Sequence, residues 1–285
     1  MARSGARTAK LMRRIRRRLA RWLAPEYEKE LRAARRRLRA TRRRLRRTRA
    51  ELEAARRYPS LFAGELPERI ARTIIAVRGE HLTYLKAGML EDLAACVCAV
   101  EQAALPGLIV EAGTARGGSA IVLAAAKAPE RPMKVYDVFG MIPPPSERDG
   151  ADVHRRYAEI AAGTAKGPGR ETYYGYRDDL YQEVEAAFAR HGVAVGAHNV
   201  ELVRGLFEDT IRLDEPVALA HLDGDWYEST MTCLERIAPL LVGGGRIVLD
   251  DYYTWSGCRQ AVDEYFSNRE GFRFEHRTRL HVLRD

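Results

Sequence analysis

Two apolar segments in the C-terminal half of this chain, residues 217–222 and 246–249, each lead into a pair of acidic residues. Short apolar runs that alternate with helical patterns are typical of buried strands in a parallel sheet. Ligands bind at the carboxyl ends of such strands, so we expect these acids to lie together at a ligand site. They are Asp223, Asp225, Asp250 and Asp251.

Four carboxylates at neighbouring strand ends repel one another, and a bound cation relieves that repulsion. Because carboxylate oxygens are hard ligands, the expected ion is Mg²⁺ or another hard divalent cation. A single aspartate after a strand is common in turns. Two pairs at two strand ends, together with the glycine turn described next, favour a functional site.

A further strand is expected at residues 108–112, followed by a glycine-rich turn and an alanine-rich helix at 120–128. In the turn, Gly113 and Gly117 allow the backbone to approach a ligand closely. The free N–H groups at the start of the helix favour an anionic group there. The spacing of the glycines differs from the G-x-G-x-x-G of dinucleotide sites, which argues against a dinucleotide oxidoreductase.

The acids around this turn indicate which ligand it holds. Residues 134–137 are expected to form a second strand that ends in Asp137, and an acid at this point commonly accepts hydrogen bonds from ribose hydroxyls. Glu111 before the turn and Ser119 after it suit a ligand with an amine and a carboxylate. The amino-acid end of S-adenosylmethionine is such a group.

The remaining elements predict a Rossmann-like α/β domain over residues 58–285, with a mostly parallel, doubly wound sheet. Residues 58–105 are expected to be helical, and residues 141–190 to form an insertion that covers the substrate. A glycine triplet at residues 243–245 is expected to turn into the fifth strand. The other expected strands are 200–205, 217–223, 246–250, 272–276 and 280–283, and the other helices are 180–190, 229–241 and 258–266.

Residues 1–57 differ sharply in charge from the rest of the chain. They hold 23 Lys or Arg and five Glu, a net charge of +18, whereas the remaining 25 basic and 34 acidic residues give −9. We therefore treat residues 1–57 as a basic helical arm on an acidic domain, and the overall charge of +9 says nothing about the active site.

The arm has an apolar stripe and then a heptad repeat of leucines, separated by Pro25. The stripe is typical of a helix at a membrane surface, so we expect an anionic membrane or anionic polymer as partner. Self-association through the leucines comes second, and specific nucleic-acid binding a distant third. The stripe comprises Leu11, Met12, Ile15, Leu19, Trp22 and Leu23, and the repeat Leu31, Leu38, Leu45 and Leu52.

The location expected from the sequence is the cytoplasm, with peripheral attachment to the inner face of the membrane as the alternative. No apolar run is long enough for a transmembrane helix, and arginines interrupt the apolar residues of segment 11–23, unlike a signal peptide. The cysteines are expected to be small buried hydrophobic residues in a reducing compartment. They are Cys96, Cys98, Cys233 and Cys258.

Three motifs resemble the macrocin O-methyltransferase family: LDGDWYEST at residues 222–230, LDDY at 249–252 and GCRQAVDEY at 257–265. The resemblance covers about residues 85–270 and implies a class I methyltransferase that moves a methyl group from S-adenosylmethionine to a sugar hydroxyl, with Mg²⁺. The glycine turn lacks the tryptophan usual in that family. The segment after Asp137 also departs from the family's usual Asp-Ser-Phe-x-Gly-x-Pro.

The resemblance also implies roles for individual residues. It implies that Asp225 is the general base, taking the proton from a hydroxyl whose pKa the metal lowers. A metal that chelates two oxygens predicts a vicinal diol as acceptor. The implied metal ligands are Asp223, Asp250 and Asp251, and the implied cofactor contacts are Glu111, Gly113, Ser119, Asp137, Leu206 and Phe207.

Other interpretations remain open at this point. The acceptor hydroxyl could belong to a catechol-like or polyketide compound, or the domain could be a non-catalytic binding module that acts through the arm. His221 is expected to be a hydrogen-bonded histidine within its strand rather than a catalytic group. Tyr252, Tyr253 and Trp255 are expected either to wall a sugar site or to belong to the core.

Overall fold

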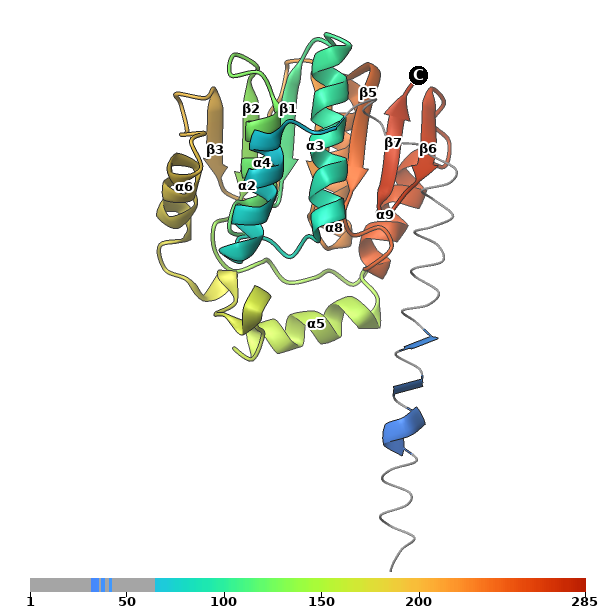
Figure 1. Ribbon diagram of the computed structural model, residues 1–285. Helices are drawn as coiled ribbons and strands as arrows, with labels where there is room; N and C mark the ends of the chain where they lie inside the picture. Colours follow the sequence, from blue (N-terminus) through green and yellow to red (C-terminus); the bar gives the residue numbers. More distant parts are fainter. Residues whose placement is uncertain (1–31, 36, 39–40, 43–64) are drawn as a thin grey trace, which may run out of the picture. The chain divides into compact units, whose positions relative to one another are not determined.

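The structure is a computed structural model, and it describes residues 32–35, 37–38, 41–42 and 65–285 (Figure 1). The chain divides into two units, Met1–Glu53 and Ala54–Asp285. The described residues of the first unit are helical, while the predicted stripe at residues 11–23 and most of the leucine repeat lie outside the described residues. Where the structure describes the chain, no helix is both long and apolar enough to cross a membrane.

The described part of the second unit is built on a seven-stranded sheet of order β3-β2-β1-β4-β5-β7-β6. The first five strands in this order run parallel to one another, and β7 runs antiparallel to both β5 and β6. The strand order reverses between β1 and β4, which is the switch point where open α/β sheets bind ligands. The strands are β1 (Leu108–Ala112), β2 (Met133–Asp137), β3 (Val200–Arg204), β4 (Val217–Leu222), β5 (Leu241–Leu249), β6 (Phe272–His276) and β7 (Leu280–Arg284).

Helices cover both faces of this sheet, as a doubly wound fold requires. One apolar core joins the sheet to α2 (Glu68–Gly79), α3 (Ala87–Gln102), α4 (Gly118–Ala126) and α6 (Leu180–Arg190). A second core joins its other face to α8 (Tyr227–Ile237) and α9 (Ser256–Phe266). Successive side chains of β1 point to opposite faces of the sheet, because Ile109 belongs to the first core and Val110 to the second. The predicted Rossmann-like α/β fold is confirmed.

The insertion between β2 and α6 contains α5 (Ala151–Ala161), which lies across one end of the sheet in Figure 1. It has a small apolar core of its own, which includes Val153 and Ile160 of α5 and reaches Trp226 after β4. Two of its acids accept hydrogen bonds from helix N-termini, where negative charge is favourable. Asp149 accepts from the N–H of Tyr227 over 2.9 Å, and Asp152 from the N–H of Ser256 over 3.0 Å.

Several boundaries differ from the prediction. The helical region expected at 58–105 is interrupted at residues 80–86, and α5 was not predicted. The glycine triplet lies inside β5, not before it. An irregularity in the pairing of β4 with β5 between Val217 and Leu219 accommodates the extra residues, with Gly244 at φ +79°. Within the described residues, all four cysteines are buried and unpaired, as expected.

Candidate active site

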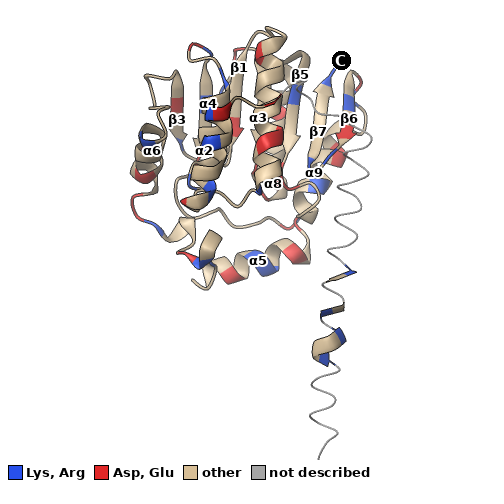
Figure 2. Ribbon diagram, in the orientation of Figure 1, with Lys and Arg blue, Asp and Glu red and all other residues tan. Residues whose placement is uncertain are grey.

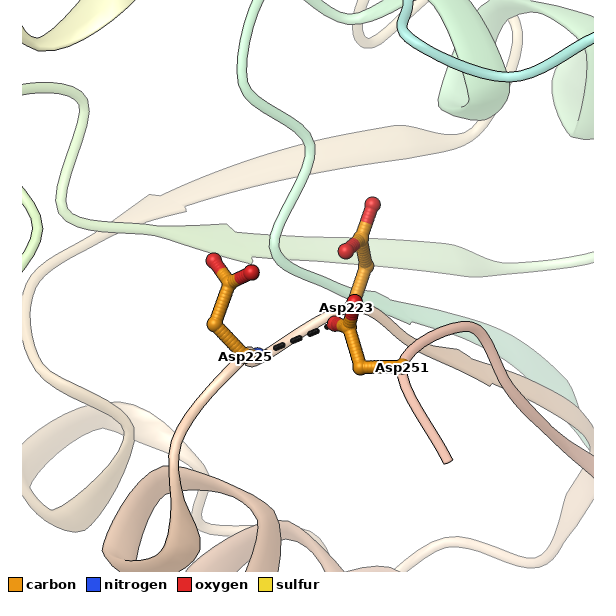
Figure 3. A group of neighbouring side chains, drawn as sticks. All are labelled: Asp223, Asp225 and Asp251. Atoms are coloured by element: carbon orange, nitrogen blue, oxygen red, sulfur yellow. Dashed lines mark hydrogen bonds between the residues drawn. The ribbon is translucent and has the colours of Figure 1, made fainter. Parts of the chain in front are cut away.

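Asp223, Asp225 and Asp251 form a compact group of carboxylates (Figure 3). Each contributes one oxygen, and these oxygens lie within 4.8 Å of one another. Asp223 and Asp225 follow β4 and Asp251 follows β5, so the parallel pairing of these strands brings the acids together. The backbone N–H of Asp225 also donates a hydrogen bond to Oδ2 of Asp251 over 3.1 Å.

Burial raises the pKa of Asp223 and Asp251 well above the usual range of a carboxyl group, and their acidic neighbours raise it further. Burial also raises the pKa of Asp225, to about 7. The three acids thus disfavour one another's ionised form in the absence of a counter-charge. A hard divalent cation supplies that charge, and the carboxylate oxygens are the ligand type it prefers, so the residues fit the expected metal.

Asp250 is held differently, by a buried arginine from the start of β7. Arg279 donates from Nη1 to Oδ1 of Asp250 over 3.1 Å and from Nη2 to the carbonyl of Met89 over 2.6 Å. Burial alone raises the pKa of the Asp250 carboxyl, but hydrogen bonds with His221 and Arg279 outweigh it and hold the pKa below its usual range. Asp250 nevertheless lines the same cavity as the other three aspartates.

Asp225 is oriented by its backbone and by an indole. Its φ of +58° is in the left-handed region, which turns the chain sharply after β4. Trp255, which precedes α9, donates from Nε1 to Oδ1 of Asp225 over 2.9 Å. Trp255 packs edge-to-face on Trp226 at 5.8 Å between ring centroids, so the indole that holds Asp225 is itself held.

The glycine turn packs directly against the end of β4. Gly113 has φ +88°, and a Cβ at this position would lie 2.0 Å from the carbonyl oxygen of Asp223. Asp137 fixes the turn, because its Oδ2 accepts hydrogen bonds from the N–H groups of Thr114, over 2.8 Å, and Ala115, over 3.0 Å. Gly117, at φ +87°, then leads into α4.

Beneath the turn, Glu111 is fully buried between two partners. Ser119 donates its hydroxyl to Oε1 of Glu111, and Nδ1 of His221 lies 3.0 Å from Oε2. Burial lowers the pKa of His221, but Glu111 and Asp250 outweigh that effect and raise it to about 9. His221 is therefore a buried, hydrogen-bonded residue of β4, as the sequence favoured, and Glu111 and Ser119 support the turn from below.

Two adjoining cavities meet at this site among the described residues. The smaller, of about 490 Å³, is lined by Leu206, Phe207 and Ser229, and the larger, of about 910 Å³, by Trp226 and Trp255. They share walls that include the glycine turn and the acidic cluster: Gly113, Asp137, Tyr174, Asp223 and Asp225.

The larger cavity has an acidic floor and an aromatic wall. Tyr84, from the loop before α3, and Tyr173, from the insertion, line it with the two tryptophans. No sequence pattern indicated either tyrosine as a site residue. Of the three aromatic residues left open above, only Trp255 lines this cavity. Tyr252 instead donates to Asp263 over 2.8 Å, and Tyr253 is 42% exposed.

The geometry can be compared with that of known proteins. The family model for macrocin O-methyltransferase (TylF) matches residues 81–272, which is most of the described domain. The chain belongs to this family. The matched region includes both pairs of aspartates, the glycine turn and the insertion that carries α5.

Two curated relatives act on natural products. An 8-demethyl-8-(2,3-dimethoxy-alpha-L-rhamnosyl)-tetracenomycin-C 4'-O-methyltransferase from Streptomyces olivaceus is 34% identical over 182 residues, and a demethyldecarbamoylnovobiocin O-methyltransferase from Streptomyces niveus is 32% identical over 187 residues. In each case the alignment covers 62% of this chain and 64% of the relative, so the chain spans slightly less than two thirds of the length of these relatives.

Among solved structures, the O-methyltransferase NovP superposes with a TM-score of 0.59 at 25% sequence identity. The superposition covers 76% of this chain and 95% of that chain. The macrocin O-methyltransferase family member described here therefore has the class I methyltransferase fold, with flanking helices on a mostly parallel sheet.

Proposed function

We propose that this chain is an O-methyltransferase that moves a methyl group from S-adenosylmethionine to a hydroxyl of a sugar on a natural product, glycolipid or polysaccharide. One observation carries the proposal: the smaller cavity and the larger cavity share Asp225 and the glycine turn as walls. A donor in one and an acceptor in the other would meet beside a carboxylate. Family membership and the rhamnosyl compound named for the first relative support this assignment.

The smaller cavity suits the donor. Leu206 and Phe207 offer an apolar surface for an adenine ring, and Asp137 reaches the same cavity as an acceptor for ribose hydroxyls. Both oxygens of Asp137 already accept backbone N–H groups, yet a carboxylate has room for about four hydrogen bonds. Glu111 and Ser119 act from beneath, where they fix Gly113 and Gly117 around the amino-acid end of the cofactor.

The chemical step needs an oxygen nucleophile in line with the sulfonium. The hydroxyl oxygen forms a bond to the methyl carbon, the carbon–sulfur bond breaks, and its electron pair stays on sulfur to give S-adenosylhomocysteine. Asp225 takes the hydroxyl proton as general base. Trp255 holds one oxygen of Asp225, which keeps the carboxylate aimed during the transfer.

Asp223, Asp250 and Asp251 are the proposed metal ligands. A divalent cation bound there would lower the pKa of the acceptor hydroxyl and position it. Asp223 and Asp251 offer oxygens within the compact group, and Asp250 offers the oxygen that Arg279 does not bind. The aromatic wall of the larger cavity, which includes Tyr84 and Trp226, suits the apolar face of a sugar ring.

The charge of residues 1–57 supports a second proposal, about location. A net charge of +18 with an apolar stripe favours attachment to an anionic membrane surface or polymer, which would place the enzyme at the inner face of the membrane. Sedimentation with vesicles that contain anionic lipid tests this. Binding that persists in the absence of residues 1–57, or that ignores salt, would contradict it.

Titration calorimetry with S-adenosylmethionine tests the proposed function directly. We expect a dissociation constant in the micromolar range for the wild type, on the order of −8 kcal/mol. The variant Asp250→Ala/Asp251→Ala should keep cofactor binding but lose binding of Mg²⁺. Asp214→Ala, an exposed acid before β4, is the control and should match the wild type in both titrations. Absence of cofactor binding with and without Mg²⁺ would refute the methyltransferase assignment.

A further inference from the structure

Arg156 is the one cationic side chain among the described residues that line the larger cavity. It comes from α5, whose basic and acidic positions are coloured in Figure 2. The acids that line the same cavity are Asp137 at the end of β2 and the four aspartates that follow β4 and β5. The cavity therefore carries negative charge at the strand ends and one positive charge on α5.

The position of Arg156 on its helix turns it toward the body of the domain. Val153 and Ile160 are buried, and Arg156 lies three residues after the first and four before the second, so the three share one helical face. Arg155, the next residue on the helix, is exposed. The buried face of an amphipathic helix normally carries apolar residues. A charged side chain on that face therefore indicates a specific role.

The contacts of Arg156 within the domain are weak. In the described part of the chain its ion pair is with Glu159, 3.2 Å away and 64% exposed, and such surface pairs contribute little. Its guanidinium lies 5.8 Å from the centroid of the Tyr173 ring. A guanidinium has five N–H donors, so most of its capacity remains for a ligand.

The charge of Arg156 reaches the reacting groups. Burial raises the pKa of Tyr84 to about 12 and that of Asp225 to about 7, and Arg156 opposes both shifts. Under the proposed function, however, the four aspartates that follow β4 and β5 are already balanced by Arg279, a divalent cation and the sulfonium of the donor, and Asp137 accepts hydrogen bonds from three backbone N–H groups. Arg156 is therefore not needed to neutralise the aspartates at the strand ends.

We propose, resting on the proposed function, that the acceptor is an acidic sugar and that Arg156 binds its carboxylate or phosphate ester. The acceptor hydroxyl lies at Asp225 while its acid group reaches across the cavity to α5. Arginine is suited to this role because its planar fork donates two parallel hydrogen bonds to a carboxylate or phosphate. Arg156 is thus a specificity-determining residue, and a neutral sugar of the same size lacks this contact.

Binding of three sugar probes tests the proposal, using full-length protein with Mg²⁺ and S-adenosylhomocysteine. The probes are methyl glucuronoside, glucose 1-phosphate and the neutral methyl glucoside. Their binding is measured by titration calorimetry or ligand-observed NMR. We expect at least one acidic probe to bind about tenfold or more tightly than the neutral one, as for a hydrogen bond to a charged group. The acidic probe that does so identifies carboxylate or phosphate as the recognised group.

Substitutions in α5 show whether Arg156 or the metal is the source of the preference for acidic probes. Arg156→Gln should remove the preference for the acidic probe, Arg155→Gln should keep it, and Glu159→Gln should keep or strengthen it. A preference that survives Arg156→Gln would overturn the proposal, as would equal binding of all probes or no binding of any. Binding of S-adenosylhomocysteine is measured in the same samples, and its absence would instead overturn the proposed function.

Discussion

Arg279 and Asp250 form a buried ion pair at the end of β5, with Nη1 of Arg279 3.1 Å from Oδ1 of Asp250 and the arginine side chain 1% exposed. The same guanidinium reaches the carbonyl of Met89 in α3 and lies 3.2 Å from Nε2 of His221 in β4. One side chain from the start of β7 thereby connects the acidic edge of the sheet to a helix that covers it.

Loss of Arg279 should destabilise the domain. Arg279→Met leaves the buried carboxylate of Asp250 with His221 as its remaining partner, and breaking a buried pair in this way costs up to about 3–5 kcal/mol. We expect the free energy of unfolding, measured by urea denaturation, to fall by this amount. Arg212→Met removes an exposed arginine and should change it by no more than about 0.5 kcal/mol.

A double-mutant cycle identifies the pair as the cause. In Asp250→Asn/Arg279→Met the buried charge is absent, so the second substitution should cost much less than it does in the wild type. If the two single losses simply add, the pair with Asp250 is not what makes Arg279 important, and its contacts with the carbonyl of Met89 and with Asp92 would be the remaining explanation.

Replacement of Asp225 by asparagine should separate proton transfer from binding. The amide oxygen of asparagine can still accept the hydrogen bond from Trp255, so the local geometry is retained. Because the amide cannot take a proton, we expect kcat for methyl transfer to fall about 10²–10⁴-fold. The dissociation constants of S-adenosylmethionine and Mg²⁺ should remain close to those of the wild type.

A loss of Mg²⁺ binding in Asp225→Asn would instead indicate that Asp225 is a metal ligand. Asp225 lies in the same group of oxygens as Asp223 and Asp251, so it is also placed to act as a metal ligand. If Asp225→Asn weakens Mg²⁺ binding as much as Asp251→Asn does, the base assignment is wrong. A variant that keeps the full rate of methyl transfer would remove it as well.

Much of this arrangement could be predicted from the sequence, because it follows from local patterns. Apolar runs ending in acids marked β4 and β5, and the glycine turn marked the start of α4. Parallel pairing of Leu222 with Leu249 then brings together the aspartates that follow the two strands. The helix α6 was expected at residues 180–190 and lies there.

Other parts of the site depend on contacts between residues far apart in the chain. Arg279 lies in a polar turn between β6 and β7, and nothing in that segment indicates that its side chain is buried against Asp250. Arg156 reaches the larger cavity only because the insertion folds across the strand ends, and Tyr84 reaches it from the loop before α3. The glycines within β5 also misled the prediction, since an irregular pairing with β4 absorbs them.

A methyl group added at Gly113 should disrupt the turn that separates the two cavities. Gly113→Ala meets both an unfavourable φ of +88° and the carbonyl oxygen of Asp223, 2.0 Å from the new Cβ. Gly163→Ala is the matched control, with φ +72° and nothing within 4 Å. The control should cost roughly 1–2 kcal/mol of stability for its backbone alone.

The difference between the two variants isolates the clash. We expect Gly113→Ala to cost about 1–3 kcal/mol more than Gly163→Ala, and to lose binding of S-adenosylmethionine, which Gly163→Ala should retain. Thermal unfolding and cofactor titration of both proteins provide the measurement. Equal stability and equal cofactor affinity would mean that the turn can shift away from β4, contrary to its tight packing here.

The free energy of unfolding should decrease as the pH falls, because of His281 in β7. Its ring is fully buried, with Nε2 2.9 Å from Oδ2 of Asp92 and Nδ1 3.0 Å from Nη1 of Arg246. Burial, together with the charges of Arg246 and Arg279, lowers the pKa of His281 to about 4 against the opposing effect of Asp92. The folded protein therefore keeps this imidazole neutral at a pH where the unfolded chain protonates it.

The sign and the pH window follow from that difference. An unfolded histidine takes up its proton near pH 6.5, so the unfolded state gains stability relative to the folded state as the pH falls from about 6.5 to about 4. The contribution of His281 to the loss is roughly 3 kcal/mol over this window. Urea unfolding of His281→Gln across the same range should therefore show a shallower dependence on pH than the wild type. His154→Gln, which replaces an exposed histidine, should follow the wild-type curve, and a His281→Gln curve of the same slope would show that this imidazole is not the group that titrates.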